Sequence, residues 1–403
     1  MMVAKTAAEV REVIAKTNDR TRLLVLQSTP FCNLNCTYCY LSEQSRSTKG
    51  LMSLDIVEKA VAFLRDGGLI KDRLTVLWHA GEPLVAPIEY YREAMNRVQQ
   101  QAPAGVQLDF DIQTNACLID SAWCEFISAS GLRVGVSIDG PKEIHDEHRI
   151  NRQGQGTFFE TMRGVNLLRE HGIPFSTISV VTSKSVGNPE HLIDFLLELD
   201  SVSIGFNVEE IEGANLESSI SIGSDEVRDF VFRIYQRLKS RGQLQRCREF
   251  KTILRQVAQA GRPAFENRQG ENKALSIITV DRLGGISTFS PELHGLQTPY
   301  TENGFAFGTV DGSLEQFLAN LEFQAVMQEI EAGIDACRSD CKYFGFCAGG
   351  SPSNKLAENG SLSSTKTQQC WFRKTLFADT LLDDFFLDLA ASTKVETGDG
   401  LRI

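Results

Sequence analysis

The chain has 403 residues, enough for roughly two or three units with buried cores. Its 41 basic and 52 acidic residues give a formal charge of -11, which argues against a surface built to bind nucleic acid or an anionic membrane. No apolar run reaches membrane-spanning length and the N-terminus lacks a signal-peptide core, so we expect a cytoplasmic protein with neither kind of partner. The 10 cysteines, in a reducing compartment, indicate metal binding or catalysis more than disulfides.

An alternation of strand and helix patterns predicts an α/β fold. After a helical segment at 1–20, short apolar runs predict strands at 22–27, 74–78, 108–113, 133–138, 175–181 and 203–208. Amphipathic stretches that begin near residues 54, 89, 120, 158, 189 and 225 predict a helix after each strand. Such consecutive parallel crossovers form an open doubly wound sheet or a partial barrel, and both gather ligands at the C-terminal ends of the strands.

The alternation stops after residue 242. We expect a connecting segment at 243–272 and a second domain at 273–390, with a tail at 391–403. Within this domain, residues 275–280 and 286–289 predict a hairpin around a Gly-Gly turn. Helices are expected at about 314–332 and in a terminal stretch that includes 371–385.

Three cysteines follow the first predicted strand within eight residues. Cys32, Cys36 and Cys39 have the spacing C-x3-C-x2-C. Three thiolates on so short a loop can bind one soft metal centre and leave one ligand position open for chemistry. Structural thiols or a zinc site are the alternatives at this stage, because thiolates also suit zinc.

A second set of cysteines lies near the C-terminus. It consists of Cys337, Cys341, Cys347 and Cys370. Four thiolates form a closed ligand set, which predicts either a complete iron–sulfur cluster or a structural zinc site. The remaining three cysteines are isolated, and we expect them to be small buried side chains: Cys117, Cys124 and Cys247.

The first cysteine motif, with a tyrosine on either side of Cys39, resembles the cluster loop of the radical SAM enzymes. The resemblance implies a partial (β/α)6 barrel in residues 21–242. It also implies a 4Fe-4S cluster whose free iron is chelated by S-adenosylmethionine (SAM). The stretch His79-Ala80-Gly81-Glu82-Pro83 is similar to the Gly-Gly-Glu-Pro motif of the family, with Ala80 in place of the first glycine. By this resemblance, Gly81 supplies a backbone contact and Glu82 binds the amino group of SAM.

Two further strand ends resemble SAM-binding segments of the peptide-modifying branch of this family. They are Gln113-Thr114-Asn115 and Ser137-Ile138-Asp139-Gly140. The resemblance implies that Ser137 and a later arginine contact the ribose and the carboxylate of SAM. Arg149 matches by position, and Arg152 could take the same role. An arginine can bind a carboxylate through two parallel hydrogen bonds, which a lysine cannot do.

The stretch CKYFGFCAGGSPSNK, which contains Cys341 and Cys347, resembles the SPASM domain of radical SAM peptide maturases. That domain usually holds two auxiliary clusters. Here Ser351 stands where the family pattern has a cysteine, and residues 274–290 contain none of the other ligands of that cluster. The resemblance therefore implies a small SPASM-like domain with one auxiliary 4Fe-4S cluster, held by the second cysteine set.

Longer phrases such as QTNACLID, VGVSIDGP and GFNVEEIEG resemble maturases of the GrrM and OscB type, which are related to three-residue cyclophane synthases. The resemblance implies a ribosomally made precursor peptide and an electron donor such as flavodoxin or ferredoxin. Hydrogen abstraction from a Cβ atom would lead to a carbon–carbon crosslink with an aromatic residue. Glu292 is our candidate for the base, with Glu209 and Glu210 as rivals. Thioether or formylglycine formation and a non-catalytic iron–sulfur carrier or sensor are the alternatives.

Overall fold

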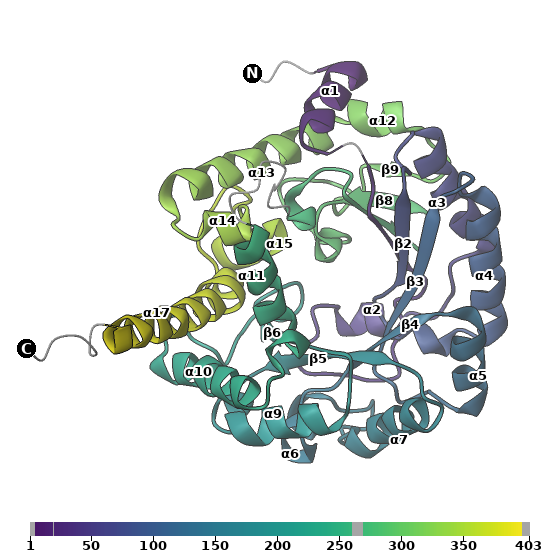
Figure 1. Ribbon diagram of the computed structural model, residues 1–403. Helices are drawn as coiled ribbons and strands as arrows, with labels where there is room; N and C mark the ends of the chain where they lie inside the picture. Colours follow the sequence, from purple (N-terminus) through teal and green to yellow (C-terminus); the bar gives the residue numbers. More distant parts are fainter. Residues whose placement is uncertain (1–4, 19, 260–268, 397–403) are drawn as a thin grey trace, which may run out of the picture.

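One nine-stranded sheet organises the chain in the computed structural model, which describes residues 5–18, 20–259 and 269–396 (Figure 1). The strands stand in the order β6-β5-β4-β3-β2-β1-β7-β8-β9. Their bounds are β1 Leu23–Gln27, β2 Arg73–Trp78, β3 Gln107–Thr114, β4 Arg133–Ser137, β5 Phe175–Val181, β6 Ser203–Val208, β7 Ile277–Asp281, β8 Gly285–Thr288 and β9 Gly308–Thr309. Neighbours among β1 to β6 pair in parallel, and Figure 1 shows helices around the outside of the curved sheet. The predicted α/β fold and partial barrel are confirmed.

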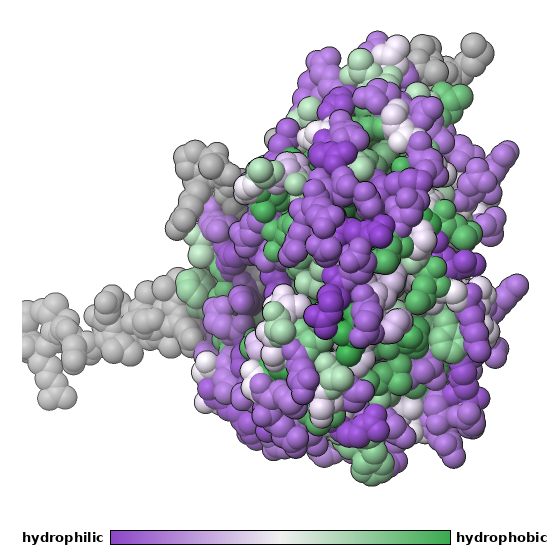
Figure 2. Space-filling view, turned by 90° about the vertical axis from the view of Figure 1, so that its right-hand side faces the viewer, coloured by the Kyte–Doolittle hydropathy of each residue, from purple (hydrophilic) through white to green (hydrophobic). Residues whose placement is uncertain are grey.

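In the barrel region the first helix precedes β1, and the other helices connect successive strands. Their bounds are α1 Ala7–Thr17, α2 Glu43–Ser47, α3 Leu54–Asp66, α4 Ile88–Gln101, α5 Ser121–Ser130, α6 Lys142–His148, α7 Phe158–Glu170, α8 Ser183–Val186, α9 Pro189–Glu198, α10 Asp225–Ser240 and α11 Arg248–Gln259. The outer face of the molecule that they form is mostly hydrophilic, with scattered apolar side chains (Figure 2). No helix in the described ranges is both long and apolar enough to cross a bilayer.

Helix α3 shows how sequence produces these elements. The Ser53 side chain accepts a hydrogen bond from the Ile56 N–H and so caps the first turn. Val57, Val61 and Leu64 recur at helical spacing and are fully buried against the sheet. The helix ends before Gly67, as predicted. Short polar helices such as α2 and α6 lack this apolar periodicity, which is why the sequence pattern did not predict them.

The C-terminal part continues the barrel sheet. Strand β7 pairs in parallel with β1, and β8 and β9 follow as antiparallel strands. The hairpin turn is held by Asp281, whose Oδ1 accepts hydrogen bonds from the Leu283 and Gly285 N–H groups at 2.8 and 2.9 Å. The sheet thus runs without a break past residue 273, where we expected the second domain to begin.

The remaining elements are η3 Gly270–Asn272, η4 Pro291–Leu293, α12 Leu314–Ala319, α13 Leu321–Asp340, α14 Phe344–Cys347, α15 Pro352–Asn359, α16 Gln368–Cys370, the π-helix Trp371–Leu376 and α17 Phe377–Glu396. The helix expected at 314–332 is two helices, because extended Asn320 caps the second through its Oδ1. The predicted connection contains α11, and its residues 260–268 lie outside the described part. Of the predicted tail, residues up to Glu396 belong to α17, and 397–403 are not described.

Candidate active site

The loop of Cys32, Cys36 and Cys39 follows β1 and is held through its backbone. The Cys32 N–H donates to the Arg46 carbonyl at 3.1 Å, and the Asn35 N–H donates to the Ile150 carbonyl at 2.8 Å. Arg46 in turn donates from Nη1 to the Cys36 carbonyl at 3.0 Å. These contacts come from two segments that follow the loop, one of them more than 100 residues further along the chain, so the positions of the three thiols depend on the folded barrel.

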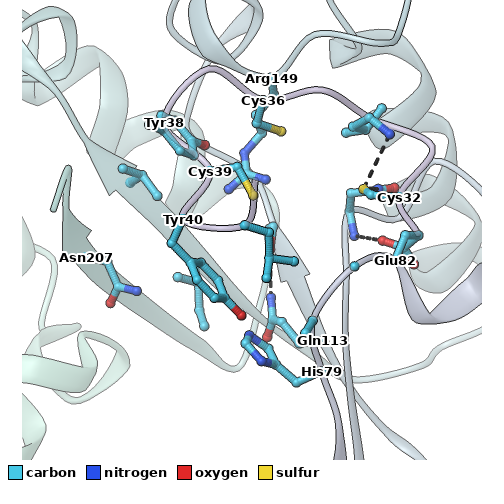
Figure 3. A pocket seen from close by; sticks show the side chains of 18 of the residues that line it. Cys32, Cys36, Tyr38, Cys39, Tyr40, His79, Glu82, Gln113, Arg149 and Asn207 are labelled. Carbon is cyan, nitrogen blue, oxygen red and sulfur yellow. Dashed lines mark hydrogen bonds between the residues drawn. The ribbon is translucent and has the colours of Figure 1, made fainter. Parts of the chain in front are cut away.

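All three thiols line one cavity of about 270 Å³ at the C-terminal ends of the strands (Figure 3). Burial raises the pKa of the Cys32 and Cys39 thiols, and it raises that of Cys36 to about 12. A bound metal centre would act in the opposite direction, since a coordinating thiol is deprotonated by the charge of the metal. Three converging soft donors beside an open cavity fit a cluster with one free iron.

Glu82 lies in the same cavity and is 1% exposed. Its Oε1 accepts hydrogen bonds from the Thr114 hydroxyl at 2.6 Å and the Leu84 N–H at 2.9 Å, and its Oε2 accepts one from the Asn115 N–H at 2.8 Å. A carboxylate offers about four acceptor sites, so roughly one remains for a further donor. Burial raises the pKa of Glu82 in spite of these hydrogen bonds. A cationic group such as an ammonium would restore its charge.

The two residues before Glu82 have left-handed backbones. A Cβ atom on Gly81, at φ 60°, would lie 2.4 Å from the Thr29 carbonyl oxygen and 2.6 Å from that of Phe31. Gly81 therefore allows close approach of the cysteine loop, whereas the resemblance implied a contact with SAM. Ala80 has φ 71°, which explains why glycine suits this position.

A buried ion pair links the cysteine loop to β4 and β5. Arg149 Nη2 lies 3.0 Å from Asp139 Oδ1, and their side chains are 9% and 2% exposed. The same oxygen accepts the Val180 N–H at 3.0 Å, and the Tyr38 hydroxyl donates to Asp139 Oδ2. Burial acts to lower the pKa of Arg149, but the charge of Asp139 raises it overall. Arg149 keeps a buried Nε–H without a partner, and it lines the cavity.

Arg152, the alternative to Arg149, takes a different place. Its Nε and Nη2 donate to the Cys32 carbonyl at 3.0 and 2.8 Å, and Nη2 also donates to the Arg46 carbonyl. It does not line the cavity. The structure therefore places Arg152 as a clamp on the cysteine loop and leaves Arg149 as the arginine at the cavity wall.

Gln113 and Ser137 occupy neighbouring strands. Gln113 Nε2 donates to Ser137 Oγ at 2.9 Å, and both residues line the cavity. In Figure 3, Gln113 lies close to His79 and to the ring of Tyr40. Burial lowers the pKa of His79 to about 4, so its imidazole is neutral. This wall therefore offers neutral hydrogen-bonding groups between the thiols and the strands.

Acidic residues gather at the β6 side of the cavity. Glu209, Glu210 and Glu292 all line it, together with Glu212, which the sequence analysis did not select. Glu209 is bound by the Ser219 N–H at 2.7 Å, and Glu210 accepts the Asn354 amide at 2.9 Å. Burial, followed by the charges of Glu271 and Glu210, raises the pKa of Glu292 to about 8. The three predicted candidates for the base thus lie together.

The position of the missing auxiliary ligand is filled by hydroxyl groups. The Ser351 hydroxyl lies 2.8 Å from Ser290 Oγ and 3.0 Å from Ser353 Oγ, and all three residues are buried. These hydrogen bonds satisfy the polar atoms without any metal. Serines are poor ligands for a soft cluster, which agrees with the loss of this cluster site.

The second cysteine set converges on its own small cavity. Cys337, Cys341, Cys347 and Cys370 come from α13, its C-terminus, α14 and α16, and they line a cavity of about 40 Å³. Burial raises the pKa of Cys347 to about 11, while the nearby Lys374 ammonium acts to lower it. In the described chain, no three His, Cys, Asp or Glu side chains are placed to hold a single metal ion. The isolated cysteines Cys117, Cys124 and Cys247 are buried.

Several functional residues had weak sequence signals. Asp139 belongs to the quoted Ser-Ile-Asp-Gly segment, but its partners lie on three separate elements. Asn115 donates its amide to Asn33 Oδ1 at 2.8 Å, and that amide lies 4.0 Å from Cys32 Sγ. Glu212 is part of GFNVEEIEG, and the three glutamates within four residues of this stretch are the sequence feature that could have indicated it.

The comparisons with known proteins agree with this geometry. The sequence pattern of the Radical SAM superfamily matches residues 26–210. An uncharacterized protein from Synechocystis sp. is 34% identical over 380 residues, which is 93% of this chain and 94% of that protein. A serine-type anaerobic sulfatase-maturating enzyme from Bacteroides thetaiotaomicron is 37% identical over 179 residues, 43% of each chain.

Solved structures show the same fold. The enzyme anSMEcpe with bound AdoMet aligns with a TM-score of 0.74 at 20% identity and covers 93% of this chain and 96% of its own. SuiB from Streptococcus suis, bound to its precursor peptide SuiA, aligns with a TM-score of 0.59 at 15% identity. That alignment covers 90% of this chain and 79% of SuiB.

Proposed function

Because the chain belongs to the radical SAM superfamily, we propose that it is a maturase that closes a carbon–carbon crosslink, of the cyclophane type, in a ribosomally made precursor peptide. Support comes from one observation above all. The three thiols and Glu82 share a single cavity with the carboxylates of the β6 side. A site that starts a radical reaction therefore faces groups that can accept the proton that leaves at its end.

SAM bound to a 4Fe-4S cluster supplies the 5'-deoxyadenosyl radical in this family. We assign Cys32, Cys36 and Cys39 to the cluster and Glu82 to the amino group of SAM. The free acceptor site on the Glu82 carboxylate and its burial suit an ammonium. Gln113 and Ser137 lie where polar groups of the nucleoside could bind between the strands.

For the carboxylate of SAM we propose Arg149 over Arg152. Arg149 lines the cavity and has a buried Nε–H without a partner, while Asp139 holds its Nη2. This arrangement leaves a donor free in a side chain that is already fixed in position. Arg152 donates hydrogen bonds to the Cys32 carbonyl and to neighbouring groups.

Glu292 remains our choice for the base. It lines the cavity, and its carboxylate interacts with its own backbone N–H, whereas residues from other segments, Ser219 and Asn354, hold Glu209 and Glu210. Burial keeps its pKa near 8, so the carboxylate binds a proton readily at neutral pH. Glu209 and Glu210 are rivals with less freedom to take up a proton.

We propose that the second cysteine set holds one auxiliary 4Fe-4S cluster, which receives the electron released when the aromatic ring is restored. The serine network around Ser351 supports one auxiliary cluster in place of two. A reduced flavodoxin or ferredoxin in the cytoplasm would supply the first electron. The peptide substrate is supported by the precursor peptide bound to SuiB.

Formylglycine formation is the second candidate, because the serine-type sulfatase-maturating enzyme is 37% identical over part of this chain. Both reactions lower the mass of the peptide by two hydrogen atoms when formylglycine is made from a serine. They differ in the product, since formylglycine is an aldehyde and a crosslink joins two residues.

The test is co-expression with peptides encoded beside the gene. We expect a product that has lost a pair of hydrogens, does not react with a hydrazide and shows no fragmentation between the joined residues. A hydrazide-reactive product would establish formylglycine formation. A reconstituted enzyme that forms no 5'-deoxyadenosine from SAM and a reductant would point to an electron carrier or sensor.

A further inference from the structure

We propose that the carboxyl groups at the β6 side of the cavity bind a cationic side chain of the substrate, an ammonium or a guanidinium. Glu210, Glu212 and Glu292 line this side, while Glu209 is bound by Ser219. The cationic group is taken to belong to the peptide substrate, so this proposal rests on the proposed function.

Carboxyl groups outnumber cationic groups at this place. The charge of Glu271, on η3, raises the pKa of both Glu212 and Glu292, although Glu271 is not in the cavity wall. Arg373, in the π-helix, acts in the opposite direction on Glu210 and Glu292. The Lys374 ammonium also interacts with Glu271. Carboxyl groups still outnumber the cationic groups here, and an additional cation would favour their ionised form.

Glu212 gives an independent indication of a ligand. Glu212 is 5% exposed and lines the cavity, and its Oε1 has no hydrogen-bond partner. A buried carboxyl oxygen without a donor is costly, so it is normally satisfied by a partner or by a bound group. A donor that enters through the cavity would meet this need.

The chemistry of the wall favours a cation over a neutral donor. Ammonium and guanidinium groups carry only donors, and carboxylates carry only acceptors when ionised. A neutral hydroxyl would satisfy one oxygen, whereas a cation would also favour the ionised form of Glu210, Glu212 and Glu292. We therefore assign an organic cation on a flexible stem.

A cation bound at the β6 side would orient the peptide in the cavity. In Figure 3, Asn207 of β6 lies across the cavity from Cys32 and Glu82. Arg149 is on the SAM side, and the free carboxyl oxygen of Glu212 belongs to the segment after β6. A substrate cation held at Glu212 would place neighbouring residues of the peptide between the two sides, within reach of the radical.

The experiment uses the reconstituted holoenzyme with SAM and two probes of the same shape. The probes are n-butylguanidinium and the neutral n-butylurea, and calorimetric titration measures the binding of each. We expect the cation to bind at least about tenfold more tightly than the urea, as charge-assisted hydrogen bonds would provide. Glu212→Gln should remove most of this preference.

Two further variants make the result specific. Glu210→Gln should also weaken the preference, and it retains an oxygen that can accept the Asn354 amide. Glu217→Gln removes one negative charge from an exposed residue outside the cavity, and it should keep the wild-type preference. Circular dichroism and iron content establish that each variant is folded and loaded, and Glu210→Gln decides if Glu212→Gln does not fold.

Equal binding of both probes to the wild-type holoenzyme would overturn the proposal. An unchanged preference in the folded Glu212→Gln and Glu210→Gln variants would do the same. Formation of 5'-deoxyadenosine is measured in the same preparations. A holoenzyme that prefers the cation but forms no 5'-deoxyadenosine would refute the proposed function and leave the cation site standing.

Discussion

The two cysteine sites differ less in their thiols than in what surrounds them. Cys32, Cys36 and Cys39 open onto a cavity of about 270 Å³ that also contains Glu82 and Arg149. The second set lines a cavity of about 40 Å³, which leaves little free space beside the thiols. An open ligand position is useful only where a substrate can reach it. The first site therefore suits chemistry, and the second suits the transfer or storage of an electron.

The largest expected effect comes from the first site. Replacing Cys32, Cys36 or Cys39 by alanine should reduce 5'-deoxyadenosine formation to background, because the cluster loses one of its three ligands. The 5'-deoxyadenosine formed is measured during anaerobic turnover with SAM and dithionite. Cys124→Ala is the matched control, since this buried cysteine lies outside both cavities. Persistent SAM cleavage in any of the three variants would remove the distinction between the sites.

The second site should behave differently. Cys370→Ala is expected to lower the iron content from about eight to about four atoms per chain, since one of two 4Fe-4S clusters is lost. SAM cleavage should continue, while crosslinking of the peptide should fall because the released electron has no acceptor. Iron, sulfide and zinc analysis checks the metal content. Zinc in the wild-type protein, with only four irons, would refute the auxiliary cluster.

Glu292 lines the cavity of the first site, and its replacement tests how the roles of the two sites are joined. Glu292→Gln should spare SAM cleavage and lower crosslinking about 100-fold, in the range of a lost general base. Burial raises the pKa of Glu292 to about 8, so its carboxylate becomes ionised, and able to act as a base, as the pH rises through that value. Crosslinked product per 5'-deoxyadenosine should therefore increase between pH 7 and pH 9, about tenfold for one group. The same variant should lose this increase.

An equal loss in Glu209→Gln and none in Glu292→Gln would move the base to the segment after β6. A pH profile that is identical in wild type and Glu292→Gln would also exclude Glu292 as the titrating group.

Replacement of each of the two arginines near the first site should change a different measured quantity. Arg149→Lys is expected to raise the KM for SAM about tenfold, because lysine cannot reproduce a bidentate contact. Arg152→Lys should leave this KM unchanged but lower the iron content, since it weakens the clamp on the Cys32 carbonyl. Initial rates over a range of SAM concentrations, with iron analysis, measure both. The reverse pattern would exchange the two assignments.

The smallest effect is expected at Ala80. Its φ of 71° strains an alanine by about 1–2 kcal/mol, and glycine would relieve that strain. The greater freedom of glycine in the unfolded chain offsets about 0.4–1 kcal/mol of the gain. Ala80→Gly should therefore raise the free energy of unfolding by about 0 to 1.6 kcal/mol, measured by denaturant titration. A large loss of stability would show that the Ala80 methyl group makes contacts that outweigh the strain.

Much of the fold could be predicted because it depends on local patterns. The strands β5 and β6 begin and end at the predicted residues, and α3 has the predicted cap and C-terminal glycine. The pairing of β7 with β1 was not predictable in this way. Periodicity identifies a strand but does not identify its neighbour, which is chosen by contacts between residues far apart in the chain.

The candidate site shows the same limit. The thiols and Glu82 have sequence signatures because their chemistry requires fixed residue types at fixed spacing. The role of Asp139 was hidden, since its partners Arg149, Tyr38 and Val180 come from three different segments. The unsatisfied oxygen of Glu212 was hidden for the same reason.

The sequence by itself determined the opening motif, the closed four-cysteine set and the order of strands and helices. Only the tertiary structure decided that Gly81 makes room for the cysteine loop, that Arg149 and not Arg152 reaches the cavity, and that glutamates gather opposite the thiols. Spacing along the chain governs which thiols can meet on one loop. Burial and hydrogen bonding between distant segments govern which charged groups are left free to act, because every buried polar atom must find its partner in the folded protein.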